Sequence, residues 1–476
     1  MGHFCTKDAD DSAGHSSRHR RDRHKYDSTE PASHEHNTLK SRREGAGLRI
    51  EDGVFGPGVG ALAVASRPTA TNGCSTFFVG SEDGNICEVS VDLQRLTSTP
   101  AANDPAVASV TRRWTAHAKD INKLLFVEST GVLYSASRDK MIVGTRVQAD
   151  GAGEKPGASP ATTTFSGHEL NVTCVAVSPP GDLLFSGSRD NTVRLWDTER
   201  GHEIARDDTK LNIVHCCQWV PELSVVAQGG EDLTIRLWDV RERPRTIGGS
   251  LTLVHTLANF DYHPICCALM GPQAQRGEVP PADGPASASS AATSTASTLV
   301  TGHNGFNGHG CMLTTWDLRG RRAVETLFGH ENTVRWVMPV PSPPRPSTAA
   351  APLSANPLPI GEIISASDDG TLKRWRIGVK PTGLASSMKL QFDAVASAAF
   401  PEGRITCMDW LARDSSTNAA GSPEGDRTMI ISTRSGVLVI AKVPVRAPPP
   451  EEGGPATVLP FTRQLQLGVD NETGGL

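Results

Sequence analysis

The sequence three times presents histidine, serine and aspartate in the same order, and these are the residue types of a nucleophilic catalytic set. The sets are His117, Ser135, Asp139, then His168, Ser186, Asp190, and His330, Ser365, Asp369. A serine activated by histidine attacks acyl groups, with an aspartate orienting the ring. A catalytic site occurs once in a chain, whereas this set recurs at the same place in successive units. We therefore expect a structural role and no catalytic residue.

The elements that position these sets are repeats of short strands. Three segments match in order, namely 167–197, 211–239 and 329–375, and Trp196 and Trp238 are 42 residues apart. Each segment alternates apolar and polar residues between Gly, Asp and Pro turns, without helical periodicity. This period is that of a four-stranded propeller blade. The fold class is expected to be all-β, a propeller with seven blades, and six or eight blades remain open.

The repeats resemble the WD-repeat family. Its marks are Gly-His at the start of a unit, Asp in the third turn, and Trp-Asp at the end, here at residues 196–197, 238–239 and 316–317. The resemblance implies a network in which a buried indole donates to serine, serine contacts histidine, and aspartate accepts from the other ring nitrogen. Carried over by residue, the networks are His168, Ser186, Asp190, Trp196 and His330, Ser365, Asp369, Trp375.

Other blades depart from this pattern. Blade 2 has His117, Ser135 and Asp139, with Thr145 at the tryptophan position, and blade 4 has Lys210 and Gln228 at the histidine and serine positions. Blade 5 has a lengthened third turn, 302–311, and blade 7 has the weakest pattern. His303, His309 and Cys311 lie in that lengthened turn, but their spacing matches no standard zinc finger. The glycines favour a tight turn, and no metal is expected.

The domain boundaries follow from composition and from the repeat. Residues 1–47 are expected to be a disordered basic tail, residues 48–446 the propeller, and residues 447–476 a Pro/Gly linker and C-terminal tail. Blade 7 lacks an outer strand in sequence order. We expect the segment around 48–50 to supply it, by analogy with the family, and 458–467 is the alternative.

The insertions predict which face of the propeller meets a partner. The stretches 271–297, 341–359 and 412–427 join the first and second strands of a blade, and 97–106 and 149–163 join the third and fourth, so all five fall on one face. The opposite, short-looped face is then free for a protein partner. The residue before each turn aspartate is expected to face solvent there, with Phe306 and Trp336 as aromatic anchors. The expected partner-binding residues are Glu82, Arg138, Arg189, Glu231, Phe306 and Asp368.

Composition limits the other function classes. The net charge of −5 over 476 residues does not favour a nucleic-acid partner. None of the standard phosphate-binding, hydrolase or zinc-protease motifs occurs, so no cofactor and no small-molecule substrate are expected. No cysteines form a Cys-x-x-Cys pair, which favours reduced thiols in an intracellular protein. No apolar run suggests a transmembrane helix or a secretory signal.

The N-terminus carries a lipidation pattern. Gly2 and Thr6 fit M-G-x-x-x-[ST], the pattern for N-myristoylation, and Cys5 is a candidate for palmitoylation. One myristoyl chain binds membranes marginally, so a second signal is needed, and Cys5 and the basic run 18–25 both offer one. We expect a cytoplasmic, peripheral membrane protein.

A narrower resemblance within the family rests on the segments 135–143, 185–197, 217–241 and 304–319, including the Asn-Gly-Phe loop. It implies a non-catalytic scaffold linked to cilia or flagella, acting in trafficking at the ciliary base. Two other scaffold roles stay open, a ubiquitin-ligase substrate receptor and a Gβ-like signalling subunit. Residues 1–47 lack the heptads of a Gβ-type coiled coil.

Overall fold

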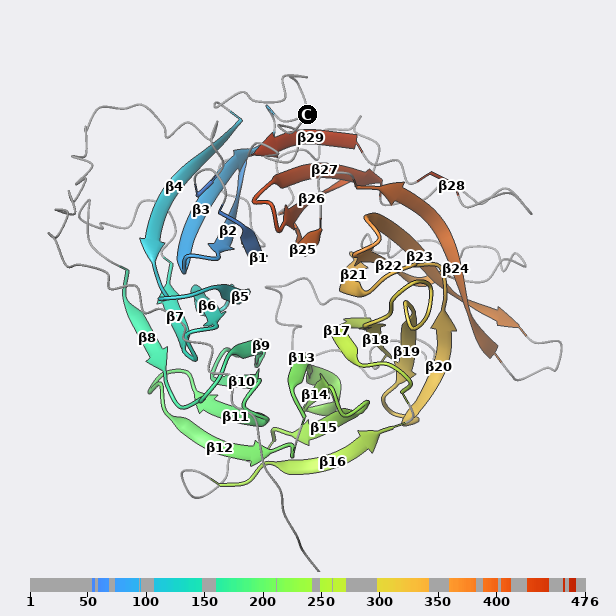
Figure 1. Ribbon diagram of the computed structural model, residues 1–476, viewed down its shortest axis with the longest axis horizontal. Coiled ribbons are helices and arrows are strands. Elements are labelled where there is room, and N and C mark those ends of the chain that lie inside the picture. The colour runs from blue at the N-terminus through green and yellow to red at the C-terminus, as the bar shows by residue number, and fades with distance from the viewer. Residues whose placement is uncertain are drawn as a thin grey trace, which may run out of the picture. The chain divides into compact units, whose positions relative to one another are not determined.

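Seven antiparallel sheets stand around a ring and form the blades of a β-propeller, as expected (Figure 1). This computed structural model describes residues 54–55, 59–67, 73–93, 95, 107–147, 160–210, 212–241, 249–258, 260–270, 298–341, 359–381, 388–400, 404–411, 426–444, 457–458 and 462–467. Each blade is a meander of four strands, called a to d from the ring axis outwards. The tail expected at residues 1–47 lies outside the described residues.

The strands of the first four blades follow in chain order. Blade 1 contains β1 Ala61–Ser66, β2 Cys74–Ser81, β3 Asn85–Asp92 and β4 Ala108–Thr115. Blade 2 contains β5 Ile121–Val127, β6 Val132–Ser137, β7 Ile142–Arg146 and β8 Thr162–Phe165. Blade 3 contains β9 Val172–Val177, β10 Leu183–Ser188, β11 Thr192–Asp197 and β12 Glu203–Asp208. Blade 4 contains β13 Val214–Val220, the 3-10 turn η1 Pro221–Leu223, β14 Val225–Gly230, β15 Ile235–Asp239 and β16 Thr252–Leu257.

The last three blades complete the ring. Blade 5 contains β17 Pro264–Met270, β18 Thr298–His303, β19 Leu313–Asp317 and β20 Arg322–Leu327. Blade 6 contains β21 Val334–Val340, β22 Pro359–Ser367, β23 Thr371–Pro381 and β24 Met388–Ala399, and β28 Thr457–Val458 pairs in parallel with β24. Blade 7 contains β25 Ile405–Trp410, β26 Asp426–Thr433, β27 Leu438–Pro444 and β29 Thr462–Leu467.

The expectation that the N-terminal segment closes the ring is wrong. The outer strand of blade 7 is β29, which pairs antiparallel with β27 from Leu438↔Leu467 to Lys442↔Thr462. It lies within 447–476, the stretch expected to be a linker and tail. Among the described residues, blade 7 is therefore built from the C-terminal part of the chain alone.

The seam between blades 7 and 1 is instead held by packing and by hydrogen bonds. Apolar side chains of both blades, with Val54, form one buried cluster. Thr406 Oγ1 donates to the carbonyl of Ala61 at 2.8 Å, and the Ser66 amide donates to Asp409 Oδ2 at 2.7 Å. These contacts hold blades 7 and 1 together and so close the ring.

Every inner strand has a bulge immediately after its first residue. The strand registers skip one residue in each blade, namely Leu62, Asn122, Thr173, His215, Ile265, Arg335 and Thr406. A bulge turns one side chain out of the strand's alternation. Asn122 Nδ2 thereby reaches the Val172 carbonyl at 2.8 Å, and Thr173 Oγ1 reaches the Val214 carbonyl at 2.6 Å. The bulges thus join some neighbouring blades and, as shown below, supply three side chains to one site.

The loop assignment made from sequence matches the order of the strands. Residues 271–297, 342–358 and 412–425 connect strands a and b of blades 5, 6 and 7, and 96–106 and 148–159 connect strands c and d of blades 1 and 2. Those residues lie outside the described part. The b–c turns and d–a loops, which form the short-looped face, are almost wholly described.

Candidate functional site

The Ser-His-Asp sets of blades 3 and 6 are closed networks around a buried indole. In blade 3, Trp196 Nε1 donates to Ser186 Oγ at 2.8 Å, and His168 lies 2.8 Å from that hydroxyl. The other ring nitrogen of His168 is 2.9 Å from Asp190, whose carboxylate also accepts from the Glu169 amide. Blade 6 repeats this geometry with Trp375, Ser365, His330 and Asp369 at 2.7–2.9 Å.

This geometry anchors strands and leaves no room for a substrate. Ser186 and Ser365 are fully buried, and each hydroxyl already accepts from an indole. Burial lowers the pKa of His168 more than Asp190 raises it, so the ring is neutral and its Nδ1–H can donate to the carboxylate. Burial alone would raise the pKa of Asp190, but hydrogen bonds from His168 and nearby amides outweigh it and hold that pKa far below its usual range.

Three other blades use variants of the network. In blade 2, His117 Nε2 is 2.8 Å from Ser135 and Nδ1 is 3.0 Å from Asp139, with no indole above them. In blade 4, Trp238 Nε1 donates to Gln228 at 3.3 Å. Lys210, at the histidine position there, is exposed, and the buried polar group of that loop is Asn212, which accepts from the Asp232 amide.

His303 of blade 5 has hydrogen-bond partners within the protein at both ring nitrogens. Its Nδ1 is 3.0 Å from the Tyr262 carbonyl, and its Nε2 is 3.1 Å from Thr301 Oγ1, which accepts from Trp316. Thr301 and His303 therefore take the places of serine and histidine in the network. Cys311 contacts the His309 carbonyl. Across the described residues, no group of three or more His, Cys, Asp or Glu side chains is arranged to hold a metal ion.

Acid is expected to destabilise the ring by protonating histidines that are buried and neutral in the folded chain. Burial lowers the pKa of His303 to about 4, from 6.5 in an unfolded chain. Below pH 6.5, His303 therefore binds a proton in the unfolded chain but stays neutral in the folded chain. The free energy of unfolding falls as a result until about pH 4. Each pH unit in this range lowers the free energy of unfolding by about 1.4 kcal/mol per such histidine. Lowering the pH from 6.5 to 5 therefore removes roughly 2 kcal/mol of that free energy through His303 alone.

The measurement is urea denaturation at pH 7 and at pH 5, for the wild type and for His303→Gln. The variant should lose part of the pH dependence although it is less stable at pH 7. Equal pH dependence in the two proteins would contradict the assignment of His303 as a buried neutral ring.

The residues expected on the short-looped face are not equally exposed. Arg138, Arg189 and Phe306 are exposed, and Arg138 lies 3.5 Å from Asp120. Glu82 and Glu231 are half-buried. Asp368 contradicts the expectation that it points to solvent, because its side chain is only 3% exposed beneath Arg335 and Arg404.

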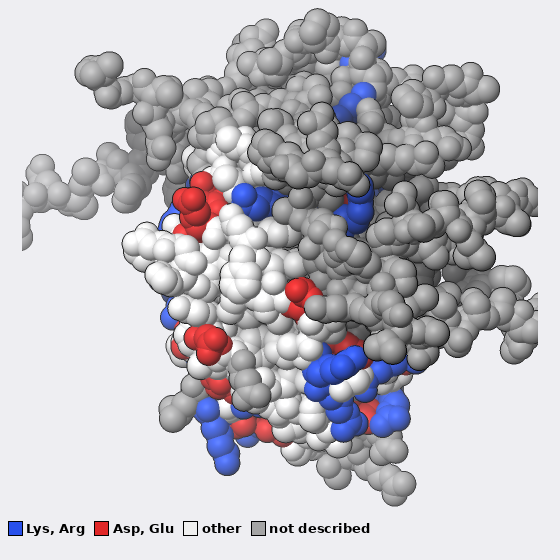
Figure 2. Space-filling view, turned by 90° about the vertical axis from the view of Figure 1, so that its right-hand side faces the viewer, with Lys and Arg blue, Asp and Glu red and all other residues white. Residues whose placement is uncertain are grey.

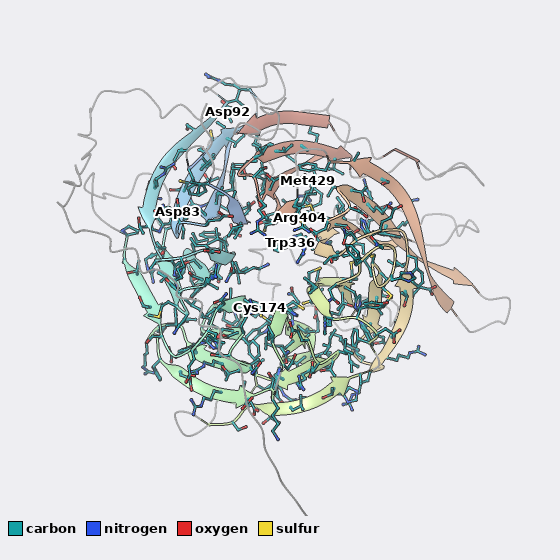
Figure 3. All side chains as sticks on the ribbon, viewed as in Figure 1. Asp83, Asp92, Cys174, Trp336, Arg404 and Met429 are labelled. Atoms are coloured by element: carbon teal, nitrogen blue, oxygen red, sulfur yellow. The ribbon has the colours of Figure 1, made fainter. Side chains whose placement is uncertain are left out.

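Trp336 also differs from expectation. It lies on the inner side of the ring (Figure 3), where Lys123 of blade 2 places its ammonium 3.8 Å from the indole centroid. Such a cation–π contact joins strands on opposite sides of the channel. Trp336 therefore bridges blades 2 and 6 and is not an anchor on the face.

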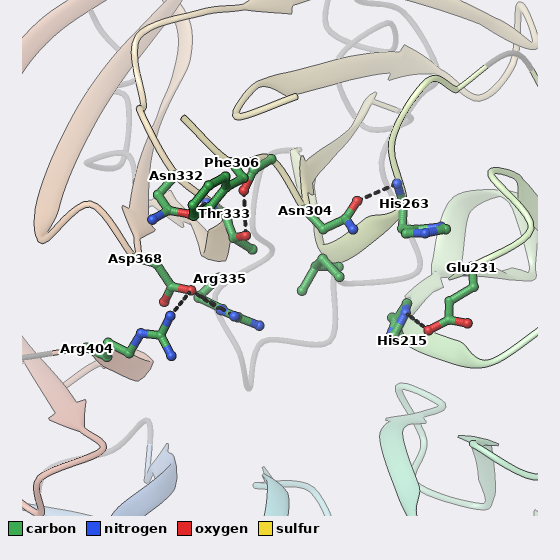
Figure 4. Close-up of a pocket in the computed structure, with 12 residues that line it drawn as sticks. His215, Glu231, His263, Asn304, Phe306, Asn332, Thr333, Arg335, Asp368 and Arg404 are labelled. Atoms are coloured by element: carbon green, nitrogen blue, oxygen red, sulfur yellow. Dashed lines mark hydrogen bonds and ion pairs between the residues drawn. The ribbon is translucent and has the colours of Figure 1, made fainter. Parts of the chain in front are cut away.

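Blades 4 to 7 surround a hollow of about 390 Å³ on the short-looped face (Figure 4). Three bulged residues of the inner strands, His215, Ile265 and Arg335, line it side by side on successive blades. The remaining lining comes from the b–c turns and d–a loops, namely Glu231, His263, Asn304, Gly305, Phe306, Asn332, Thr333, Asp368 and Arg404. We refer to this site as the hollow.

The charges of the hollow are divided between two ends. At one end, Arg335 Nε and Nη2 donate to Asp368 at 2.9 and 2.7 Å, and Arg404 Nη2 lies 3.3 Å from the same oxygen. At the other end, Glu231 is 3.4 Å from His215. Burial lowers the pKa of His215 more than Glu231 raises it, so this ring is neutral near pH 7.

The Asn-Gly-Phe loop of blade 5 is clamped to both neighbouring loops. The Asn304 side chain accepts from the His263 amide at 2.7 Å, and the Gly305 carbonyl accepts from Thr333 Oγ1 at 2.8 Å. A side chain at Gly305 would collide with the Cys311 backbone at 2.1 Å, which explains the glycine. The loop thereby fixes Phe306 with 67% of its surface exposed at the edge of the hollow.

Of the residues that line the hollow, Glu231, Phe306 and Asp368 were predicted from the sequence, and most of the others were not. His215 and Arg335 look like ordinary strand residues in the sequence, because nothing there marks the bulge that turns them. His263 and Arg404 lie directly before inner strands, in loops that the repeat pattern does not constrain. The one available signal was the Asn-Gly-Phe loop.

On the side drawn in Figure 2, Lys and Arg side chains are interspersed with Asp and Glu. Gly2 and Cys5 lie outside the described residues. In the described part of the chain, no helix is long and apolar enough to cross a membrane, and the nine cysteines are free.

Comparisons with known proteins agree with the repeat. A family model described as WD domain, G-beta repeat, matches residues 159–197 and 200–239. Eukaryotic translation initiation factor 3 subunit I of Neosartorya fischeri is 35% identical over 85 residues, which are 18% of this chain and 22% of that protein. WD repeat-containing protein 18 of Homo sapiens is 54% identical over 39 residues, 8% of this chain and 9% of that protein. Ribosome biogenesis protein ERB1 of Yarrowia lipolytica is 35% identical over 65 residues, 12% of this chain and 8% of that protein. The chain matches less than a quarter of the length of each relative.

Proposed function

The chain is a seven-bladed β-propeller of the WD-repeat family, a scaffold for protein interactions, and we propose that it binds its partner on the short-looped face around the hollow. The observation that carries this proposal is the exposed, fixed Phe306. An aromatic side chain held rigidly at the edge of a polar hollow loses little entropy on binding, and such residues dominate interface energies. Phe328, which is 73% exposed, begins the d–a loop that the Asn-Gly-Phe loop contacts through Gly308 and Glu331.

Affinity purification of the full chain tests this proposal. We compare the wild type with Phe306→Ala, and with Leu253→Ala as a matched control, because Leu253 is 45% exposed on the outer strand β16. Phe306→Ala should lose the proteins that the wild type enriches, while Leu253→Ala keeps them. The converse result would place the partner on the rim of the ring.

We further propose that the scaffold is held at a membrane through acylation of Gly2 and Cys5, with the basic run 18–25 as an additional signal. Val54, in the buried cluster between blades 1 and 7, marks where the chain enters the described ring.

Trafficking at the base of a cilium or flagellum is the process that we propose for this anchored scaffold. Its support is the resemblance of the segments 217–241 and 304–319 to WD repeat-containing protein 31. The relatives reported above bear names from translation and ribosome biogenesis, but their matches cover little more than shared repeats. The proteins captured by the wild type and lost with Phe306→Ala decide between ciliary transport, a ubiquitin ligase and a G-protein complex.

A further inference from the structure

Two arginines in the hollow share one buried carboxylate. Arg335 and Arg404 both pair with Asp368, and their side chains are 42% and 56% exposed, whereas that of Asp368 is 3% exposed. Among the described residues, no other carboxylate forms an ion pair with either guanidinium. The two arginines and Asp368 at this end of the hollow therefore carry one positive charge in excess. The exposed guanidinium groups present that charge to solvent.

The guanidinium groups keep donors for a ligand. Asp368 accepts hydrogen bonds from Nε and Nη2 of Arg335, but it pairs with only Nη2 of Arg404. Figure 4 shows the two groups on either side of the carboxylate at one wall of the hollow. A guanidinium fork matches the two oxygens of a carboxylate, and charge-assisted bonds of this kind are about twice as strong as neutral ones.

The rest of the hollow limits what this ligand is. Ile265 and Phe306 add apolar surface beside the arginines, which suits a hydrophobic side chain next to the anion. Glu231, 41% exposed, lies at the other end beside a neutral His215. A second negative charge is disfavoured there, so the single charge of a carboxylate fits the one excess positive charge better than a phosphate dianion does.

From this arrangement we infer that the hollow recognises a short segment of a partner protein in which an aspartate or glutamate lies next to an apolar residue. The acidic side chain binds Arg335 and Arg404, and the apolar one packs on Phe306 and Ile265. This inference rests on the proposed function, and it adds to it the type of partner segment that the hollow binds. The hollow is large enough for two or three side chains.

The test begins with the immobilised full chain and a phage-displayed library of random heptapeptides. Selected peptides should combine an acidic residue with an adjacent aromatic or aliphatic one. One selected peptide is then synthesised with its acidic residue intact, replaced by the amide, and replaced by phosphoserine. Each is titrated by fluorescence anisotropy against the wild type, Arg404→Gln and Arg200→Gln. Arg200 is the matched control, because its side chain is 72% exposed and ion-paired with Asp197 at 3.2 Å, in the loop between β11 and β12 and away from the hollow.

We expect the amide peptide and Arg404→Gln each to weaken binding about tenfold, with little further loss when they are combined, because both remove the same contact. Arg200→Gln should bind as the wild type does, and the phosphoserine peptide should bind more weakly than the acidic one. A library without an Arg404-dependent acidic binder overturns the inference, and so does tighter binding of phosphoserine. If Phe306→Ala still loses the captured proteins in that case, the proposed function stands without this chemistry.

Discussion

Replacing Trp196 by alanine is expected to lower the free energy of unfolding by roughly 3–5 kcal/mol, the usual cost of removing a buried tryptophan. The Trp196 side chain is 1% exposed and meets the Phe165 ring edge-on, with centroids 5.9 Å apart. Its indole also donates to Ser186, which contacts His168, so the change removes packing and a buried donor together. Urea denaturation followed by tryptophan-independent circular dichroism measures the loss.

Trp196→Phe separates the two contributions. Phenylalanine keeps most of the apolar contact but leaves Ser186 without the indole donor, so it should cost about 1–2 kcal/mol. An alanine variant as stable as the wild type would mean that Trp196 is not part of the blade core. Equal losses in both variants would mean that the hydrogen bond, and not the packing, holds strand β11.

Gly2→Ala is expected to move the protein from the membrane fraction to the supernatant almost completely, because N-myristoylation requires an N-terminal glycine. Cys5→Ser should give an intermediate distribution, since one myristoyl chain binds marginally and the basic run 18–25 supplies only part of the second signal. Raised salt should then detach Cys5→Ser more readily than the wild type, because screening weakens the basic run but not buried acyl chains.

Fractionation combined with mass spectrometry of the N-terminal peptide reads out these variants. The wild type should show Gly2 carrying a myristoyl group. An unmodified Gly2, or an acetylated Met1, in a protein found wholly in the supernatant would contradict the anchor. The propeller and its hollow would be unaffected by that result.

The repeat made most of the fold predictable. The networks of blades 3 and 6 could be predicted because His168 and His330 recur together with their serines. In each blade a buried indole N–H needs the same kind of hydrogen-bond acceptor. Closure was not predictable in the same way. The sequence of strand β29 has no mark that distinguishes it from the segment around residue 48 as the partner of β27. Only the tertiary arrangement decides between them.

The hollow was less predictable than the fold, for two physical reasons. Bulges turn His215 and Arg335 out of the strand alternation, and a residue that leaves the alternation looks like any other strand residue in sequence. Asp368 lies directly before a turn aspartate, the place expected to face solvent. It is buried because Arg335, at the bulge of strand β21 33 residues before it, and Arg404, in the loop before β25 36 residues after it, close over it. Such long-range pairs carry no local signal.

Photo-crosslinking tests the central claim, that the partner binds around the hollow, most directly. The photoreactive phenylalanine analogue benzoylphenylalanine is placed at position 306 in one protein and at position 253, on the outer strand β16, in another. Both are then irradiated in cells that produce the full chain. The account predicts a discrete crosslinked partner from position 306, abolished by excess of a peptide selected on the hollow, and none from position 253. A partner crosslinked from position 253 and absent from position 306 would contradict it.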